Sequence, residues 1–483
     1  MYKISVYDRY HNYIELQAKP GETLFSVFSR HQPPVFKGNC GGRGQCMSCS
    51  VFVEEKRAYV KACRTIVEQD LHVVLPFSLG RTEAPKLLLE CSPSDMEAME
   101  LHHHSYGAAI DIGTTSIGMC LMDLDKGSFT GQCHPGDVFE GAVCEYNLYN
   151  PQAVYGADVI SRIAYARKRE HAKHLQNLVW EQLLFGINAM LNEARLSSKN
   201  LTHISIAANT TMLHLLMGYD ASGLGSYPFH TEHLQAIKGS LSQLKLDLPV
   251  LEQWGDVKLC IYPGCSAYVG ADIIAGATAL SLGEKEKYDL LIDLGTNGEI
   301  LLVNANQGYA GATACGSAFD AYVTAGGYST DLLSRLVLLK GRGIIRKNGS
   351  LMERYLESGY VFPDGVTITQ EIIENILKAK AAIRTGLDMI LEKAGITFDS
   401  CRVYVAGNFG FHLDLNAAKA IGMFPEGGEI MIAGNTSLEG AKRLLAMPQA
   451  SIDMANAICS RTQVLEFAND SSFAKRYISQ MTI

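Results

Sequence analysis

Long uninterrupted apolar segments are missing from this sequence of 483 residues. No apolar run reaches 18 residues, so we expect no helix that spans a membrane. The N-terminus lacks the pattern of a secretory signal, because Lys3, Asp8 and Arg9 interrupt any apolar core. The net charge of −8 argues against nucleic acid or an anionic membrane as the main partner. The length predicts two to four domains of a soluble globular protein.

Two common nucleotide-binding signatures are also absent, namely the G-x-x-x-x-G-K-[ST] loop and a G-x-G-x-x-G turn that opens a helix. The sequence does contain 13 cysteines, which in a chain this long fit a reducing compartment better than a disulfide framework. Nine of them lie singly or in a C-x4-C pair, and we expect these to be small buried hydrophobic residues. They are Cys91, Cys120, Cys133, Cys144, Cys260, Cys265, Cys315, Cys401 and Cys459.

The other four cysteines predict an iron–sulfur cluster. Cys40, Cys46 and Cys49 follow a C-x5-C-x2-C pattern, one residue longer in the first gap than in plant-type ferredoxins. Glycines 38, 41, 42 and 44 suit a tight loop with backbone N–H groups close to sulfide. Residues 50–53 and 58–60 are typical of a hairpin that returns Cys63 to this loop as the fourth ligand.

Zinc is the rival metal, but structural zinc sites usually have paired C-x2-C knuckles, and this region has one such pair. The pattern therefore favours a 2Fe–2S cluster. Residues 2–7 and 12–18 alternate as strands do, and residues 22–30 predict a short helix. This order of elements resembles a β-grasp ferredoxin domain over residues 1–80. Residues 81–106 form a break in composition, which we interpret as a linker.

Two similar turns follow the linker. Asp111-Ile112-Gly113-Thr114-Thr115 ends one apolar strand, and Asp293-Leu294-Gly295-Thr296-Asn297-Gly298 ends another, 182 residues later. Glycine, threonine and asparagine in such turns offer backbone N–H groups and side-chain donors to phosphate oxygens. A carboxylate at the strand end can hold hydrated Mg²⁺. The repeat suggests duplicated lobes that face one another.

A third element fits a nucleotide site. A helical pattern continues from about residue 370 to 394, and a strand at 402–406 then runs into Gly407-Asn408-Phe409-Gly410. This pattern resembles the adenosine motif of the actin, sugar-kinase and heat-shock-chaperone ATPase superfamily. The resemblance implies two RNase H-like α/β lobes, over residues 107–287 and 288–483, with ATP in the cleft. By the same resemblance, Asn209 and Thr210 face the catalytic centre.

The resemblance implies specific roles in ATP hydrolysis. Asp111 and Asp293 would act through Mg²⁺ and water. Glu299 and Asp272 are candidates for aligning the attacking water, and a structural role is the alternative for each. Gly407, Asn408 and Gly410 would approach adenosine. The phosphate-binding residues would be Gly113, Thr114, Thr115, Gly295, Thr296, Asn297 and Gly298.

The order of ferredoxin and ATPase, with the segments 156–162, 209–215 and 293–299, resembles the reductive activators of corrinoid enzymes. Longer members carry a further domain between these two parts, so this chain resembles a short form. The resemblance implies a cytoplasmic, anaerobic protein that passes one electron to the inactive cob(II)amide cofactor of a partner protein. An upstream ferredoxin or reductase would supply that electron. The sequence leaves open whether the chain forms a homodimer.

Three alternative functions are consistent with the same sequence motifs. The acceptor could be a non-corrinoid metalloprotein, such as a double-cubane iron–sulfur protein, because the loop at 313–320 differs from the Gly-Pro form expected of corrinoid activators. The chain could instead be a redox-regulated kinase for a small molecule. The third alternative is a non-enzymatic scaffold in which both sites are structural, and this alternative predicts no ATP hydrolysis.

Overall fold

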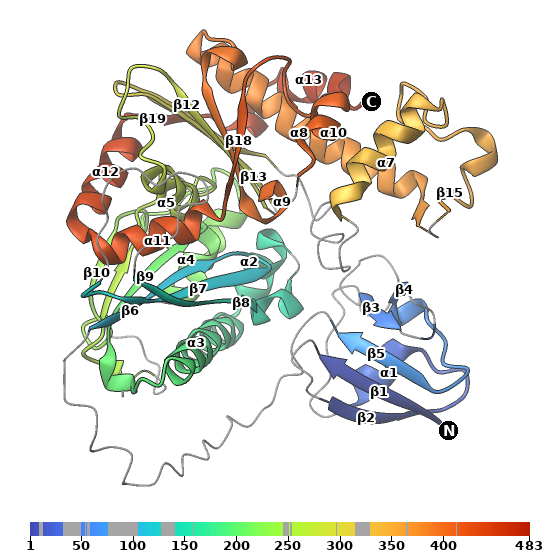
Figure 1. Cartoon of the computed structure of the whole chain (residues 1–483), viewed down its shortest axis with the longest axis horizontal. Helices are drawn as coiled ribbons and strands as arrows, with labels where there is room; N and C mark the ends of the chain where they lie inside the picture. The colour runs from blue at the N-terminus through green and yellow to red at the C-terminus, as the bar shows by residue number, and fades with distance from the viewer. Residues whose placement is uncertain are drawn as a thin grey trace. The chain divides into compact units, whose positions relative to one another are not determined.

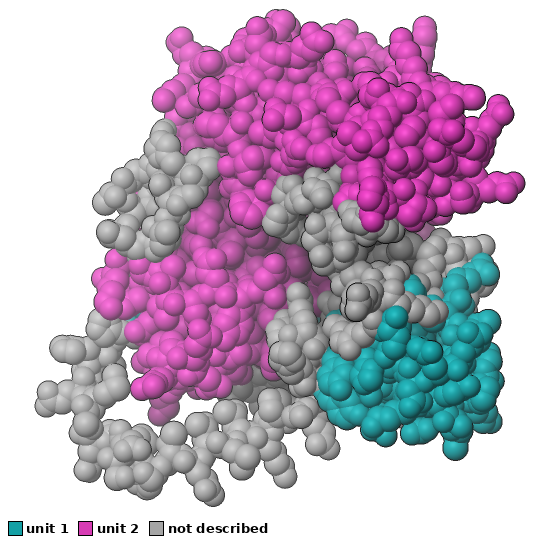
Figure 2. All heavy atoms as spheres, turned by 45° about the vertical axis from the view of Figure 1, so that its right-hand side comes forward, with its two compact units in different colours: residues 1–105, 151–157 teal, residues 106–150, 158–483 magenta. Residues whose placement is uncertain are grey.

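The computed structural model describes residues 1–8, 13–31, 50–53, 55, 58–75, 105–126, 141–156, 158–244, 251, 254–295, 297–313, 329–363, 366–411 and 413–483. Its residues group into two compact units, coloured separately in Figure 2. The N-terminal unit comprises residues 1–105 and 151–157, and the larger unit comprises residues 106–150 and 158–483. None of the helices in these ranges has the length and hydrophobicity needed to cross a bilayer.

The N-terminal unit is a five-stranded mixed sheet in the order β2-β1-β5-β3-β4, accompanied by helix α1 (Leu24–Arg30) (Figure 1). Its strands are β1 (Tyr2–Asp8), β2 (Tyr13–Ala18), β3 (Ser50–Val53), β4 (Ala58–Lys61) and β5 (Leu71–Leu75). Strand β1 pairs with β2 antiparallel and with β5 parallel. This is a β-grasp topology, and the predicted strands, helix and hairpin lie where the alternation of residues indicated. The predicted linker falls largely outside the described residues.

The larger unit contains two six-stranded sheets. The first has the order β10-β11-β9-β6-β7-β8. Its strands are β6 (Tyr106–Ile112), β7 (Ser116–Asp123), β8 (Ala142–Tyr149), β9 (Leu201–Ala208), β10 (Ile237–Ser240) and β11 (Lys258–Ile261). Strands β6, β7 and β8 form an antiparallel meander, whereas β9 and β11 run parallel to β6.

The second sheet repeats this design in the order β18-β17-β12-β13-β14-β19. Its strands are β12 (Asp289–Leu294), β13 (Gly298–Val303), β14 (Gly308–Thr313), β17 (Arg402–Ala406), β18 (Ile430–Gly434) and β19 (Thr462–Val464). Again the first three strands form an antiparallel meander, and the next two run parallel to the first. The repeated turns of the sequence thus belong to two sheets of one topology, and both lobes are mixed α/β structures.

Helices cover both sheets. The first sheet packs against α3 (Arg169–Glu193) through β7 and β8, and against α11 (Thr436–Ala446) through β6 and β9. The second packs α8 (Gln370–Ala394) against β13 and β14. The other helices of this unit are α2 (Val159–Ala166), α4 (Thr210–Met217), α5 (Ala271–Ala279), α7 (Ser329–Gly341), α9 (Gly407–Phe411), α10 (Leu415–Ala420), α12 (Pro448–Arg461) and α13 (Phe473–Gln480).

One hydrophobic core joins the two sheets. Ala109 and Cys120 enter it from the first sheet, and Leu291 and Leu301 from the second, together with apolar residues of α5, α11 and α12. Helix α11 follows β18 of the second sheet but packs on the first, where Ser205 Oγ donates to Ala441 O at 2.6 Å. The far end of the chain therefore helps to complete the first lobe.

Candidate functional site

Four acidic side chains meet between the two sheets, and we call them the carboxylate cluster. Asp111 lies on β6, Asp293 on β12, Glu299 on β13 and Asp272 in the first turn of α5. Asp293 and Glu299 are paired across neighbouring strands. Only the folded chain brings these four residues together, because they belong to four separate secondary-structure elements.

The pKa values of these carboxyls are raised because burial and like charges disfavour ionisation. Burial, then the charges of Asp272 and Asp111, raise the pKa of Asp293 to about 8. Burial and Asp111 raise the pKa of Asp272 to about 6. Burial raises the pKa of Glu299 well above its usual value, and Asp272 and Asp293 add to the shift. Several carboxyls whose pKa values are shifted together mark a candidate functional site.

Asp111 accepts hydrogen bonds from two residues at the start of α11, the N-cap Asn435 and Ser437 in the first turn. Ser437 Oγ donates to Asp111 Oδ1 at 2.7 Å, and Asn435 Nδ2 donates to Oδ2 at 2.9 Å. Burial raises the pKa of Asp111, and these two donors oppose the rise. Sequence reasoning missed both residues, because they lie more than 320 positions from Asp111 and carry no motif.

The first glycine-threonine turn is held from several directions. Gly113 N donates to Ser116 O at 2.9 Å, which closes the turn, and Asn150 Nδ2 donates to Gly113 O at 2.8 Å. The buried Arg162 guanidinium donates to Thr114 O. Asn209 Nδ2 donates to Thr114 Oγ1 at 3.2 Å. A rigid turn of this kind keeps its remaining donors oriented.

Asn209 also links the turn to the helix that follows β9. Its Oδ1 accepts from Met212 N at 2.9 Å and so caps α4, whose first residue is Thr210. Gly270 lies against this cap, since a Cβ there would stand 2.8 Å from Asn209 Cα and 2.7 Å from Asp272 Oδ1. The start of α5 and the cap of α4 therefore need glycine to approach each other.

The second turn and the third motif are also adjacent. Gly295 N donates to Asn297 O at 3.1 Å, and Gly298 begins β13. Gly407 has φ +86°, and a Cβ at this position would lie 2.4 Å from Asp293 Oδ1. Only glycine fits there. Asn408 and Gly410 lie in the short helix α9, which begins at Gly407.

Some predicted site residues lie outside the described residues. They are Cys40, Cys46 and Cys49 of the cluster loop and Thr296 of the second turn. Cys63 is described and buried, in the 3₁₀ turn η2 (Ala62–Arg64) that follows β4. Among the residues that the structure describes, no three His, Cys, Asp or Glu side chains are placed to hold a metal ion together, and this includes those of the carboxylate cluster.

The prediction that the scattered cysteines are buried is partly wrong. Cys120 and Cys401 are buried, but Cys144, Cys260, Cys265 and Cys459 are partly exposed. Cys144 lies on β8 at the edge of the first sheet, and Cys265 lies in a loop, so neither occupies the middle of a sheet. Cys91, Cys133 and Cys315 lie outside the described residues.

Family comparisons agree with the arrangement of the larger unit. Residues 106–285 match a family described as the RACo middle region, and residues 338–483 match the C-terminal domain of RACo, the ASKHA domain. The chain belongs to the family of reductive activators of corrinoid enzymes. Its C-terminal domain is thus of the ASKHA, or actin-like ATPase, type.

Individual relatives carry related descriptions. The chain is 29% identical over 434 residues to "Corrinoid activation enzyme RamQ" of Eubacterium limosum, with 77% of this chain and 69% of the relative aligned. It is 19% identical to "[Co(II) methylated amine-specific corrinoid protein] reductase" of Methanosarcina barkeri, with 78% of this chain and 77% of the relative aligned.

A solved structure shares the fold of the activator. It is described as "Reductive activator for corrinoid, iron-sulfur protein", and it superposes with a TM-score of 0.67 at 22% identity. The alignment covers 100% of this chain and 98% of the solved one.

Proposed function

We propose that this activator uses ATP to deliver one low-potential electron to the corrinoid cofactor of a partner protein, reducing Co(II) to Co(I). The observation that carries the proposal is the carboxylate cluster between two lobes of one topology, bordered by two glycine turns. The relatives described as acting on corrinoid proteins support a corrinoid protein as the partner.

The carboxylate cluster fits Mg²⁺ and a nucleotide. Asp111 and Asp293 would hold the hydrated ion, because Mg²⁺ prefers one or two carboxylates together with water and phosphate. Bound Mg²⁺ would supply positive charge against the phosphates. The turns at Gly113–Thr115 and Gly295–Gly298 would donate to phosphate oxygens. Gly407 lets the third motif pack closely against Asp293, where that motif would approach adenosine.

The acidic residues would also handle the proton of the attacking water. Glu299 is buried, and Asp272 and Asp293 lie close enough for their charges to raise its pKa further. Two carboxyls so close share a proton readily, which keeps one of them available as a base near neutral pH. We infer that the pair of Glu299 and Asp272 would align the attacking water.

The β3–β4 hairpin suits the fourth ligand of a 2Fe–2S cluster. Ser50, the residue after Cys49 in the sequence, pairs with Lys61, two residues before Cys63. The register therefore places Ser50 and Lys61, which lie close to Cys49 and Cys63 in the sequence, together at the open end of the hairpin. A cluster held there would supply single electrons at a potential near −400 mV, as in plant-type ferredoxins.

ATP is needed if the acceptor lies below the donor in potential. For one electron, each 59 mV is tenfold in equilibrium, so a gap of roughly 240 mV is about four decades. Two lobes that close around a ligand can couple its binding to a changed docking surface. Closure over the carboxylate cluster would provide that coupling.

The test is an anaerobic reduction assay with the full chain and a corrinoid protein in the Co(II) state. We expect Co(I) absorption to appear with Mg–ATP and an electron donor, and not with a non-hydrolysable analogue. Equal reduction without ATP would contradict the proposal. Phosphorylation of a small molecule without any partner protein would favour a kinase instead.

A further inference from the structure

Two cysteines from distant parts of the chain lie together in the larger unit. Cys265 Sγ and Cys459 Sγ are 2.9 Å apart, although 194 positions separate them in the sequence. The distance is shorter than van der Waals contact between sulfur atoms, and a disulfide needs a separation of about 2.05 Å. Both side chains are partly exposed, so a small reagent can reach them.

We propose that Cys265 and Cys459 form a reversible disulfide that ties the segment bearing Asp272 to the edge of the second sheet and slows ATP turnover. The regulatory part of this inference rests on the proposed function. The disulfide itself rests on the position of the two sulfur atoms.

Cys265 lies in the loop 262–270, which joins β11 to α5. Its N–H donates to Val269 O at 2.9 Å, and the loop ends at Gly270, which lies against the Asn209 cap of α4. Thr210 Oγ1 donates to Ser266 O at 2.8 Å, which fastens the loop to α4. The loop that carries Cys265 is therefore fastened to α4 and its cap, beside the proposed cleft.

Cys459 occupies the last turn of α12, next to the second sheet. Strand β19 begins three residues later at Thr462 and pairs with β14. Arg461 anchors the same turn, because its guanidinium donates to Ala305 O and Gly283 O. A bond between the two sulfur atoms would thus connect the α5 loop to an anchored end of the second lobe and restrict closure.

The chemistry requires a disulfide oxidant. Cys265 Sγ–H donates to Cys459 Sγ, so Cys459 is the sulfur better placed to act as the nucleophile. Its thiolate attacks a small-molecule disulfide, whose S–S bond breaks and releases one thiolate. Cys265 then attacks the mixed disulfide and expels the second thiolate. Two protein thiols give up two protons and two electrons, and the small disulfide becomes two thiols.

The experiment treats the full chain with oxidised glutathione and maps its peptides by mass spectrometry without reduction. We expect a peptide pair joined through Cys265 and Cys459, together with ATP turnover lowered about tenfold because the closing motion gates the rate. Dithiothreitol should restore the rate. Cys459→Ser should show neither effect, and Cys260→Ser, which alters a neighbouring cysteine but keeps the pair, should behave as wild type.

The outcomes separate the two proposals. Absence of the joined peptide would overturn the disulfide, whatever the chain does with ATP. A joined peptide with unchanged turnover would overturn the regulatory role. A chain that turns over no ATP before oxidation would contradict the proposed function, while the peptide map would still decide whether the bond forms.

Discussion

At the scale of single residues, the carboxylate cluster shows the conflict between stability and function. Asp293 has a pKa raised to about 8, so its folded-state carboxyl holds a proton that the unfolded chain has lost near neutral pH. The stabilisation from this proton is fully present below about pH 4 and is lost as the pH rises to about 8. A bound cation would reverse the preference and favour the ionised form.

Asp293→Asn should therefore raise the melting temperature of the ligand-free protein at pH 8 while weakening the stabilisation by Mg–ATP. Each pKa unit corresponds to about 1.36 kcal/mol, so we expect a gain on the order of a few kcal/mol. Thermal unfolding between pH 5 and 8, with and without Mg–ATP, measures both effects. The exposed Asp399→Asn is the control, and a parallel pH dependence in both variants would refute the argument.

Ser437→Ala should slow ATP hydrolysis by about tenfold, because a hydrogen bond to a charged group contributes about 1.5–3 kcal/mol. Without the Ser437 hydroxyl the pKa of Asp111 rises further, so the acidic limb of the rate profile should move to higher pH. Ser437→Thr should restore much of the rate. The pH profile of turnover measures this, with the exposed Ser460→Ala as control, and an unshifted profile would exclude a role for the donor.

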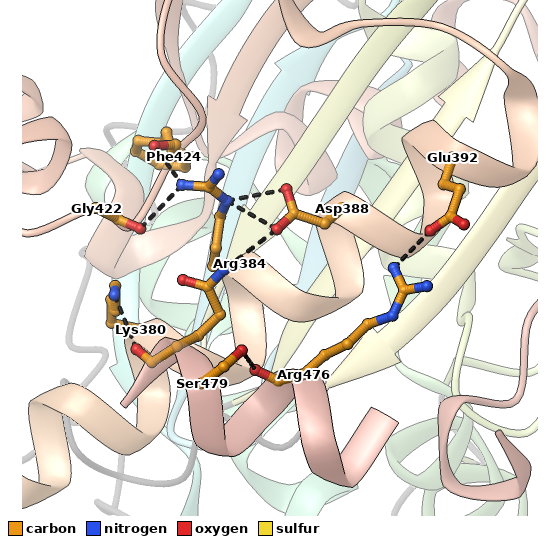
Figure 3. A network of polar contacts seen from close by, with 9 residues as sticks. Lys380, Arg384, Asp388, Glu392, Gly422, Phe424, Arg476 and Ser479 are labelled. Atoms are coloured by element: carbon orange, nitrogen blue, oxygen red, sulfur yellow. Dashed lines mark hydrogen bonds and ion pairs between the residues drawn. The ribbon is translucent and has the colours of Figure 1, made fainter. Parts of the chain in front are cut away.

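At the scale of elements, the C-terminal helix α13 is attached both by polar contacts and by Phe473, which packs against the core of the second lobe. None of its residues is buried. Figure 3 shows Arg476 of α13 paired with Glu392 of α8. Lys380 Nζ donates to Gln480 O at 2.8 Å and to Thr482 O at 3.1 Å. Arg384 of α8 donates hydrogen bonds to the Asp388 carboxylate and to the carbonyl oxygens of Gly422 and Phe424 (Figure 3).

Lys380→Met should lower the free energy of unfolding by about 1–3 kcal/mol, because two carbonyl groups then lose their donor. Lys378→Met changes an exposed lysine of the same helix and should lie within about 0.5 kcal/mol of wild type. Urea unfolding of both variants measures the difference. Equal stability of the two would show that water replaces the donor at no net loss.

The proposed role of Cys63, which follows the β3–β4 hairpin, as a cluster ligand can be tested by substitution. Cys63→Ala should remove the visible absorption of a 2Fe–2S cluster, because three thiolates leave one iron site incomplete. Cys144→Ser, on β8 of the larger unit, should leave the spectrum unchanged. Absorption and electron paramagnetic resonance of the reduced protein measure this. A retained spectrum in Cys63→Ala would exclude Cys63 from the ligands.

At the scale of the whole molecule, the chain divides its tasks between two compact units. The candidate cluster cysteine Cys63 belongs to the N-terminal unit, and the carboxylate cluster belongs to the larger unit. The larger unit shares one core between its two sheets, so movement of one lobe against the other must shear or hinge around α5, α11 and α12.

Asp111→Ala should abolish ATP hydrolysis and electron delivery yet leave the cluster spectrum intact, because Asp111 lies in the other unit. Parallel measurements of phosphate release, corrinoid reduction and visible absorption check this separation. Loss of the spectrum together with hydrolysis would show that the two units do not act independently. Retained hydrolysis would remove Asp111 from the proposed site.

The sequence by itself determined the β-grasp strands, the helix over residues 370–394 and the duplicated turns after Asp111 and Asp293. These features depend on local alternation, capping and glycine, which neighbouring residues specify. Only the tertiary structure decided that Asn435 and Ser437 bind Asp111, that Asp272 joins the carboxylate cluster, and that Cys265 meets Cys459. Such contacts depend on how α5, α11 and α12 pack between the sheets, and non-local packing leaves no periodic signal in a single sequence.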